Sequence, residues 1–294
     1  MTLCAQQVRP YLIRAVTELH CGVGQGLDDI DLPTAKEALT GLPVVPGSTV
    51  KGVLRDHYGA KGEAEYLAAF GPPPELADEH ASALHFTDAR MLFLPVRSFS
   101  GVFACVTSPL VLRRLVRDLE HADGMAQDFP PLPELEVREA VVVAGSPLVT
   151  GGKLLLEELD LAVQGASPEW QTFFESLLTT DWDKETVLPR LAIVHDDVLT
   201  FLCETALPVR AHIRLNPDSG TVAKGALWYE ESLPSETLLF GLAMANASRR
   251  EGCGHDAKWF LDTYGTGELF LQFGGKATTG KGLCEMRFLD GGKA

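Results

Sequence analysis

A glycine-rich segment with two lysines separates two short runs that are typical of strands near the end of the sequence. It runs Gly274-Gly275-Lys276-Ala277-Thr278-Thr279-Gly280-Lys281-Gly282. Glycine accepts positive φ and lets backbone N–H groups approach a partner closely, and lysine adds point charges suited to phosphate. The flanking runs, residues 268–273 and 283–289, favour a β-hairpin. We therefore expect a tight connection that either binds an anion or serves only as a turn.

The same segment matches a nucleotide-binding P-loop only in part. Gly275, Gly280 and Lys281 stand at the Walker A spacing, but Gly282 occupies the position of the Ser or Thr that holds Mg²⁺. A P-loop also opens a helix, whereas a strand-like run follows here. These departures disfavour a nucleotide triphosphatase and leave a polyphosphate such as RNA as the candidate anion.

Composition excludes several classes of protein. The 294 residues suffice for one large core or two smaller ones. No apolar run approaches the roughly 20 residues of a membrane span, and Gln6, Gln7 and Arg9 interrupt any signal-peptide core. Six cysteines without a CxxC pair argue against zinc and against a disulfide framework. We expect a cytoplasmic protein with no membrane partner.

The net charge of −15 weighs against general nucleic-acid binding, yet the charges are unevenly distributed. Basic residues gather in four groups, namely Lys51 with Arg55, Arg90 with Arg97, Arg113 with Arg114 and Arg117, and Lys276 with Lys281. A protein with one basic face and an acidic remainder can still bind a polyanion.

Short strand-like and helical runs alternate without a regular βαβ series, which predicts an α+β fold with antiparallel hairpins. A strand is expected over residues 10–19 and a hairpin around residues 216–220, which are rich in turn residues. A helix is expected with Ser48 as its N-cap. Lys51 and Arg55 lie four residues apart on one face of it, beside an N-terminus suited to a phosphate. RNA contact and an ordinary charged surface are the two interpretations of this face.

Several blocks resemble the RAMP proteins of CRISPR effectors. The N-terminal blocks are Thr17-Glu18-Leu19-His20-x-Gly22-x-Gly24, Ile30-Asp31-Leu32-Pro33 and residues 40–55, TGLPVVPGSTVKGVLR. Residues 86–90 (FTDAR), 94–104 (LPVRSFSGVFA) and 226–234 (ALWYEESLP) are similar to the backbone subunit of the type III-B (Cmr) complex. The resemblance covers nearly the whole chain in order.

This resemblance implies one RAMP domain over residues 1–294, with a ferredoxin-like (RRM-like) palm that carries insertions and a β-hairpin thumb. The palm is expected at about residues 8–108 and 232–290, a helical and acidic insertion at about 109–205, and the thumb at about 206–231. The expected partners are a guide crRNA, target RNA, copies of the chain in a helical filament and other type III-B subunits.

The resemblance also implies the site residues. An Asp in the loop after His-x-Gly-x-Gly serves target cleavage in the family, and here it is Asp31, the expected catalytic residue and ligand of a divalent metal, Mg²⁺ or Mn²⁺. The motif histidine is His20. The expected RNA-binding residues are Ser48, Lys51, Arg55, Gly274, Gly275, Lys276, Gly280, Lys281 and Gly282. One departure from the family is Lys36, which stands where Arg is usual and lacks its bidentate fork.

Each candidate also has a structural interpretation. Asp28, Asp29 and Asp31 together suit a solvated loop, and His20 suits a buried structural histidine as well as a general base or guide contact. Glu230 and Glu231 either assist the chemistry or are a solvated strand end, which we favour. Asp196 and Asp197 beside His195 suit a metal cluster or, more simply, an acidic helix start. The roles of Arg113, Arg114 and Arg117 stay open.

Three functions follow from these features. The first is a crRNA-binding backbone subunit that is also an endoribonuclease and cuts complementary target RNA at regular intervals by metal-assisted in-line attack with Asp31. Sequence reading by the guide explains why no base-reading aromatic signature is present. The second is a non-catalytic crRNA-binding scaffold. The third, a stand-alone crRNA-processing RAMP nuclease, is disfavoured by the thumb hairpin and the Asp31 loop.

Overall fold

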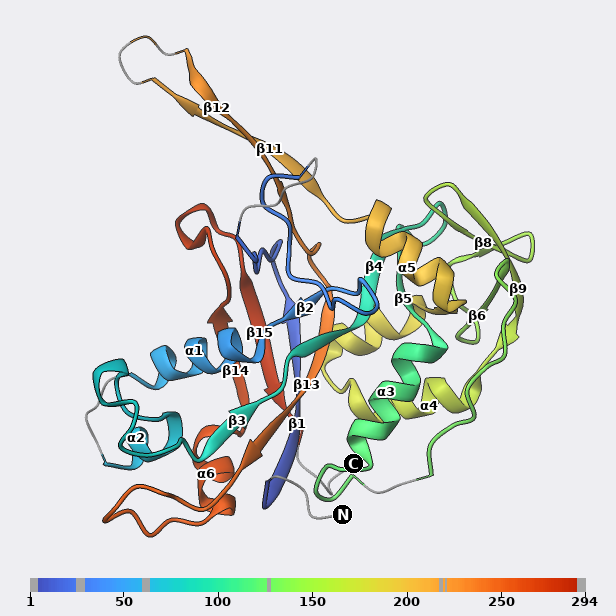
Figure 1. The fold of residues 1–294 in the computed structure, drawn as a ribbon. Helices are drawn as coiled ribbons and strands as arrows, with labels where there is room; N and C mark the ends of the chain where they lie inside the picture. Colours follow the sequence, from blue (N-terminus) through green and yellow to red (C-terminus); the bar gives the residue numbers. More distant parts are fainter. Residues whose placement is uncertain are drawn as a thin grey trace.

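One large mixed sheet runs through the molecule, and a two-stranded hairpin projects from its upper edge (Figure 1). The computed structural model describes residues 5–24, 30–59, 64–125, 128–216, 219 and 221–289. Within these ranges the sheet contains 13 strands. Its neighbours are antiparallel except for two parallel pairs, β5 with β10 and β6 with β9. The chain therefore combines hairpins with crossovers, as the irregular order of elements predicted.

Eleven strands form the path of this sheet, and two short strands join it from the side. In spatial order the path is β14 (Glu268–Gln272), β15 (Leu283–Phe288), β1 (Gln7–Ala15), β13 (Leu238–Ala245), β4 (Ala89–Arg97), β5 (Phe103–Thr107), β10 (Leu191–Val194), β6 (Glu139–Val142), β9 (Leu159–Ala166), β8 (Lys153–Leu156) and β7 (Val149–Thr150). β2 (Val44–Val45) pairs with β4, and β3 (Leu84–Phe86) pairs with β13.

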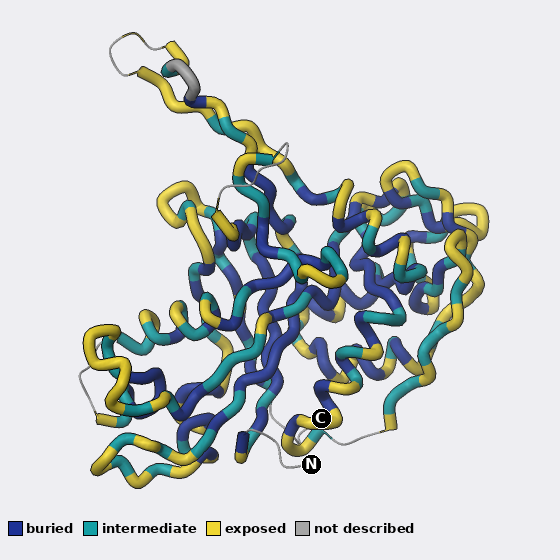
Figure 2. Tube along the Cα trace, in the orientation of Figure 1, coloured by how far each residue is buried: buried dark blue, intermediate teal, exposed yellow. Residues whose placement is uncertain are grey.

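The core lies along the central strands β1, β13 and β4, which are dark in the burial view (Figure 2). Tyr11 and Ile13 of β1 are fully buried, and apolar residues follow one another along β13 without alternation. Such continuous burial requires cover on both faces of the sheet. Helices supply part of it: α1 and α6 pack against one half of the sheet and α3 against β4.

The helices are of ordinary length, and among those described none combines the length and apolar character needed to cross a membrane. They are α1 (Gly47–Tyr58), α2 (Ala64–Phe70), α3 (Pro109–Leu119), α4 (Pro168–Leu177), α5 (Asp196–Thr205) and α6 (Ala257–Tyr264), with short helical turns η1 (Pro74–Leu76), η2 (Asp183–Val187), η3 (Leu188–Arg190) and η4 (Ala277–Thr279). In α3 the residues Val111, Leu112 and Leu115 face the core, which places its arginines on the outer side.

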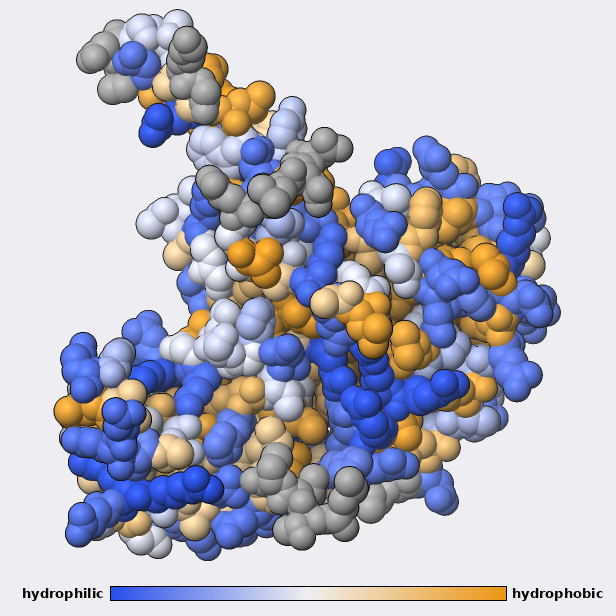
Figure 3. Space-filling model, in the orientation of Figure 1, coloured by the Kyte–Doolittle hydropathy of each residue, from blue (hydrophilic) through white to orange (hydrophobic). Residues whose placement is uncertain are grey.

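The predicted hairpin is present as β11 (Val209–Leu215) and β12 (Val222–Glu231), an antiparallel pair that forms a sheet of its own. Cross-strand pairs alternate between its two faces. One face exposes apolar side chains, with Ile213 opposite Leu227, and the other carries Arg210 opposite Glu230 and His212 opposite Trp228. Figure 3 shows apolar side chains along this projection.

Two local predictions need correction. The first strand, β1, ends at Ala15, because residues 16–19 leave it to bond with Leu283 and Leu233. Ser48 is not the N-cap of α1: the helix begins at Gly47, and the backbone N–H of Gly47 donates to the Asp88 carboxylate at 2.8 Å. An acceptor from another segment thus replaces the local cap.

Candidate functional site

Three segments far apart in the sequence meet at the root of the hairpin: the segment around Asp31, the end of β12 and the connection between β14 and β15 (Figure 1). Leu32 lies parallel to Glu230, donates to the Tyr229 carbonyl at 3.0 Å and accepts from the backbone N–H of Glu231 at 3.0 Å. The Asp31 segment is therefore an extra strand-like edge on β12.

Asp31 is exposed on this edge, and its Oδ2 accepts the backbone N–H of Tyr229 at 2.8 Å. This hydrogen bond fixes the direction of an exposed carboxylate. Asp28 and Asp29 lie outside the described residues. Within the described part of the chain, no three His, Cys, Asp or Glu side chains gather closely enough to hold a metal ion by themselves.

His20 is buried beside this edge, with Nδ1 at 2.7 Å from the Glu231 carbonyl oxygen. A carbonyl oxygen only accepts, so Nδ1 carries a proton and donates it to this oxygen. A Cβ on Gly22 would lie 2.6 Å from Nε2. The glycine of the His-x-Gly motif thus leaves room for the histidine ring.

Glu230 is fully buried among cations at the same root. Its Oε1 lies 3.0 Å from Lys281 Nζ and 3.7 Å from His212 Nε2, and its Oε2 lies 3.7 Å from Lys276 Nζ. Burial alone raises the pKa of Glu230, but the hydrogen bond from Lys281 and the positive charge of His20, Lys281 and Lys276 outweigh it, and the pKa falls below its usual value. The two predicted RNA-binding lysines therefore share one carboxylate.

Two further carboxylates complete the charge network. Glu18 binds Arg210 of β11 and lies 3.4 Å from Lys281; these cations lower its pKa, the Arg210 hydrogen bond most of all. Glu231, also buried, binds Lys36 Nζ at 2.7 Å and the Thr34 backbone N–H at 3.1 Å. A solvated strand end was the wrong expectation for Glu230 and Glu231.

The glycine-rich connection is mostly exposed, and two of its glycines are required by packing. Gly274 has φ +69°, and a Cβ there would lie 2.1 Å from the His20 carbonyl oxygen; at Gly282, with φ +75°, it would lie 2.0 Å from the Phe273 carbonyl oxygen. The close approach predicted for these glycines is an approach to the protein's own backbone. Gly275 donates to the His20 carbonyl at 3.2 Å, which fastens the connection to the histidine.

Lys51 and Arg55 form a separate group on α1. Lys51 Nζ donates to Ser82 Oγ at 2.6 Å, and Arg55 donates to the Pro72 carbonyl at 3.1 Å, while Ser48 is exposed in the first turn. α1 packs between β14 and β3. In the part of the chain that the structure describes, no hydrogen bond or ion pair joins this group to Lys276 or Lys281.

The remaining candidates have structural partners. Arg114 pairs with Glu37 at 2.6 Å and Arg117 with Asp118 at 3.1 Å. The acidic start of a helix is confirmed at α5: His195 Nδ1 accepts from the Asp197 backbone N–H, and Asp196 accepts from the Leu110 backbone N–H at the start of α3.

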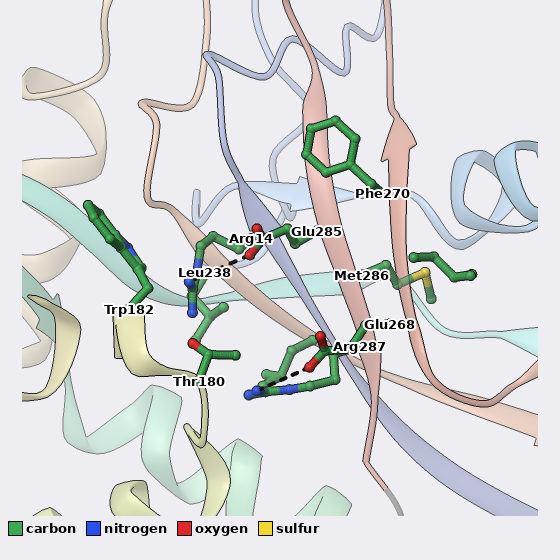
Figure 4. A pocket seen from close by; sticks show the side chains of 11 residues that line it. Arg14, Thr180, Trp182, Leu238, Glu268, Phe270, Glu285, Met286 and Arg287 are labelled. Carbon is green, nitrogen blue, oxygen red and sulfur yellow. Dashed lines mark ion pairs between the residues drawn. The ribbon is translucent and has the colours of Figure 1, made fainter. Parts of the chain in front are cut away.

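A pocket of about 280 Å³ opens elsewhere, between the edge of the sheet and the segment before η2 (Figure 4). Its two arginines are neutralised: Arg14 binds Asp183 and lies 3.6 Å from Glu285, and Arg287 lies 3.4 Å from Asp183. None of the sequence-predicted site residues lines it. Sequence reasoning weighed Glu230 and Glu231 but missed two other residues at the hairpin root, Tyr229, whose backbone N–H holds Asp31, and Glu18, which binds Arg210.

Comparison with known proteins identifies the class of protein to which a mixed sheet with a projecting hairpin and a polar hairpin root belongs. A model described as the RAMP superfamily matches residues 12–285, and the chain belongs to that superfamily. The CRISPR system Cmr endoribonuclease Cmr4 of Pyrococcus furiosus is 35% identical over 289 residues, 95% of each chain. The CRISPR system CMR subunit Cmr4 of Saccharolobus solfataricus is 26% identical over 310 residues, 96% of this chain and 97% of that one.

Solved structures agree. The crystal structure of oligomeric Cmr4 from Pyrococcus furiosus has a TM-score of 0.74 and 25% identity, and the match covers 98% of this chain and 100% of that one. A chain in the cryo-EM structure of the Type III-B Cmr-beta bound to cognate target RNA has a TM-score of 0.75 and 19% identity, with 97% and 98% covered. At that identity the second match supports the fold alone.

Proposed function

We propose that the chain is a crRNA-binding backbone subunit of a type III-B CRISPR effector complex and that it cleaves complementary target RNA. The observation that carries this proposal is Asp31, an exposed carboxylate fixed by Tyr229 at the root of a projecting hairpin, next to two lysines that share the buried Glu230. The relative at 35% identity is named an endoribonuclease, and a related solved structure is oligomeric.

In this proposal the sheet around β1, β13 and β4 is the ferredoxin-like palm, and β11 with β12 is the thumb. The exposed apolar face of the hairpin supports a contact with the next copy in a filament, because an isolated two-stranded hairpin with an uncovered apolar face is marginally stable in water. The hairpin exposes Val209, Ile213, Leu215, Val222 and Leu227 by about half each, and Ile213 lies opposite Leu227 on one face.

The chemistry follows from what each side chain can reach. In target cleavage the 2′-oxygen attacks the adjacent phosphorus in line, a 2′,3′-cyclic phosphate forms, and the bond to the 5′-oxygen breaks with protonation of that oxygen. The exposed carboxylate of Asp31 is the group available at the scissile phosphate. It suits Mg²⁺ or Mn²⁺, which bind through one or two carboxylates plus phosphate oxygens and which stabilise charge on the phosphate.

His20 and the lysines support this group. His20 is buried and bonded to the Glu231 carbonyl, so we assign it a positioning role that holds the residues after β1 against β12. Lys276 is about one-third exposed and Lys281 less so, so Lys276 is the better placed for the guide phosphates, with Lys281 held behind it by Glu230. Glu230 carries one negative charge against two ammonium groups, so it does not neutralise both lysines.

The test is cleavage of a complementary RNA by the assembled complex containing Asp31→Asn in place of the wild-type chain. Asn keeps an oxygen that accepts from Tyr229 and removes the charge. Loss of cutting with unchanged guide and target binding supports the proposal. Unchanged cutting removes Asp31 from the chemistry and favours the non-catalytic scaffold, while absence of guide RNA from the wild-type complex ends the proposed function altogether.

A further inference from the structure

A second cationic group lies on the β3 side of α1 and is built from three elements. Lys51 projects from α1, His85 lies on β3, and Arg249 is in the loop that follows β13. β3 pairs with β13 so that His85 is opposite Met244, and α1 packs on β3. Sheet pairing and helix packing therefore bring the three side chains to one place, although 198 positions separate Lys51 from Arg249 along the chain (249 − 51).

Only neutral groups are bonded to the first two. Lys51 Nζ donates to Ser82 Oγ at 2.6 Å, and His85 Nε2 lies 3.3 Å from Asn246 Nδ2. Arg249 is exposed, and within the described residues its guanidinium has no ion pair. The contrast with Lys281 is direct, because Lys281 has Glu230 and Glu18 as partners.

The electrostatics of this group are unfavourable in the free protein. Burial and the charge of Arg55 lower the pKa of Lys51, and burial followed by the charges of Lys51 and Arg249 lowers the pKa of His85. Among the described residues, no carboxylate contributes to either shift. Lys51 and Arg249 are like charges without a counter-charge there, and a bound anion would relieve their repulsion and favour the protonated imidazole of His85.

We infer that Lys51, His85 and Arg249 form a second phosphate-binding position for RNA, on the opposite side of α1 from the glycine-rich connection. Asn246 adds a neutral side-chain amide of the kind that commonly binds phosphate oxygens. This inference rests on the proposed function, since a guide strand supplies a regular series of phosphates. A strand that crosses α1 then contacts Lys276 on one side and this group on the other.

The surface agrees with an RNA track at this edge. In Figure 3 hydrophilic side chains cover the loop between β13 and α6, next to the lobe formed by α1 and α2. An acidic segment of a neighbouring protein is the other class of partner that suits three cations. RNA is favoured because Lys51 belongs to the same helix whose Arg55 and N-terminus the sequence places on an RNA-binding face.

The experiment measures binding of a fluorescein-labelled, unstructured single-stranded RNA to the full chain by anisotropy over a series of salt concentrations. Arg249→Gln and His85→Gln are compared with Lys276→Gln on the other side of α1 and with Arg138→Gln, an exposed arginine of the insertion. Each lost phosphate contact lowers the salt slope by about 0.7 for a single strand. Thermal melting of each variant checks that it folds as the wild type does.

A lower salt slope for Arg249→Gln, with no change for Arg138→Gln, supports the inference, and His85→Gln should lower the slope only at a pH acidic enough to protonate the imidazole. If only Lys276→Gln lowers the slope, the second position is wrong and the proposed RNA-binding function stands. If Arg249→Gln leaves RNA binding intact but weakens self-association in analytical ultracentrifugation, the partner is an acidic protein surface and the inference is overturned. Absence of RNA binding by the wild-type chain overturns it together with the proposed function.

Discussion

Lys281 Nζ lies 3.0 Å from Oε1 of the fully buried Glu230, and this pair joins the end of the hairpin to the glycine-rich connection. Glu230 follows Tyr229, whose backbone N–H holds Asp31. The residues that hold the candidate catalytic carboxylate and the candidate guide-binding lysines, Tyr229 and Glu230, are therefore adjacent on β12. We therefore expect a substitution in one part of the site to affect the other through the backbone of Tyr229 and Glu230.

The first prediction concerns stability against acid. The pKa of Glu230 is depressed in the folded state, so its charge contributes stability at pH above its unfolded value of about 4.3, and this contribution is lost as pH falls through the folded value. Glu230→Gln keeps the shape and leaves Lys276 and Lys281 without their counter-charge. We expect a loss of about 1–3 kcal/mol at neutral pH and a flatter decline below pH 4.5. Urea unfolding followed at several pH values measures both.

Glu139→Gln is the control for this measurement, because Glu139 lies in the insertion and its carboxylate accepts from the neutral Gln164 amide and the Glu136 backbone N–H. If Glu230→Gln and Glu139→Gln have the same midpoint and the same pH profile, the buried charge is not stabilising.

The sequence predicted the hairpin, the helix α1 and the connection between β14 and β15 because each has a local signal: turn residues, helical spacing or clustered glycines. It did not predict the partners of Lys281. Glu230 lies 51 positions earlier, and its burial depends on how the hairpin root packs against the residues after β1. Two adjacent acids in a strand normally place at least one in solvent, so local reasoning favoured exposure.

The second prediction separates two roles of glycine. Gly274 and Gly280 both have positive φ, but only at Gly274 would a Cβ meet the His20 backbone; at Gly280 nothing lies within 4 Å. Gly280→Ala should cost about 1–2 kcal/mol from backbone conformation alone. Gly274→Ala should cost a further amount of about 1–3 kcal/mol because the His20 segment must shift. Equal unfolding free energies for the two variants would contradict the contact with His20.

The third prediction tests the electrostatics around His85 in the free chain. Lys51 of α1 and Arg249 of the loop after β13 are the charged groups that lower the pKa of His85. Removing a like charge favours the protonated imidazole, so Lys51→Met should raise the pKa of His85 toward 6.5. NMR titration of the imidazole resonances measures this value. Lys153→Met, which removes a lysine paired with Asp160, should leave it unchanged.

Asp31 shows why the candidate site was only partly accessible to sequence reasoning. The family resemblance selected the residue, since three nearby aspartates are chemically alike. Its orientation depends on the backbone N–H of Tyr229, 198 positions away, and no property of the Tyr side chain signals that bond. Main-chain partners of this kind are set by strand register, which the local sequence leaves open.

The last prediction concerns Lys36, which stands where the family usually has arginine. Its ammonium binds the buried Glu231 at 2.7 Å, so lysine does form the pairing that its missing fork put in question. Lys36→Met leaves a buried carboxylate with one remaining donor, Thr34 N–H, and should cost about 2 kcal/mol. Lys36→Arg keeps the charge and should cost little.

Because the Glu231 backbone also holds His20 and Leu32, Lys36→Met should slow target cleavage by the assembled complex at a temperature where the variant is fully folded. Full cleavage activity in Lys36→Met, with its stability lowered as expected, would mean that the Glu231 pair stabilises the fold without positioning Asp31.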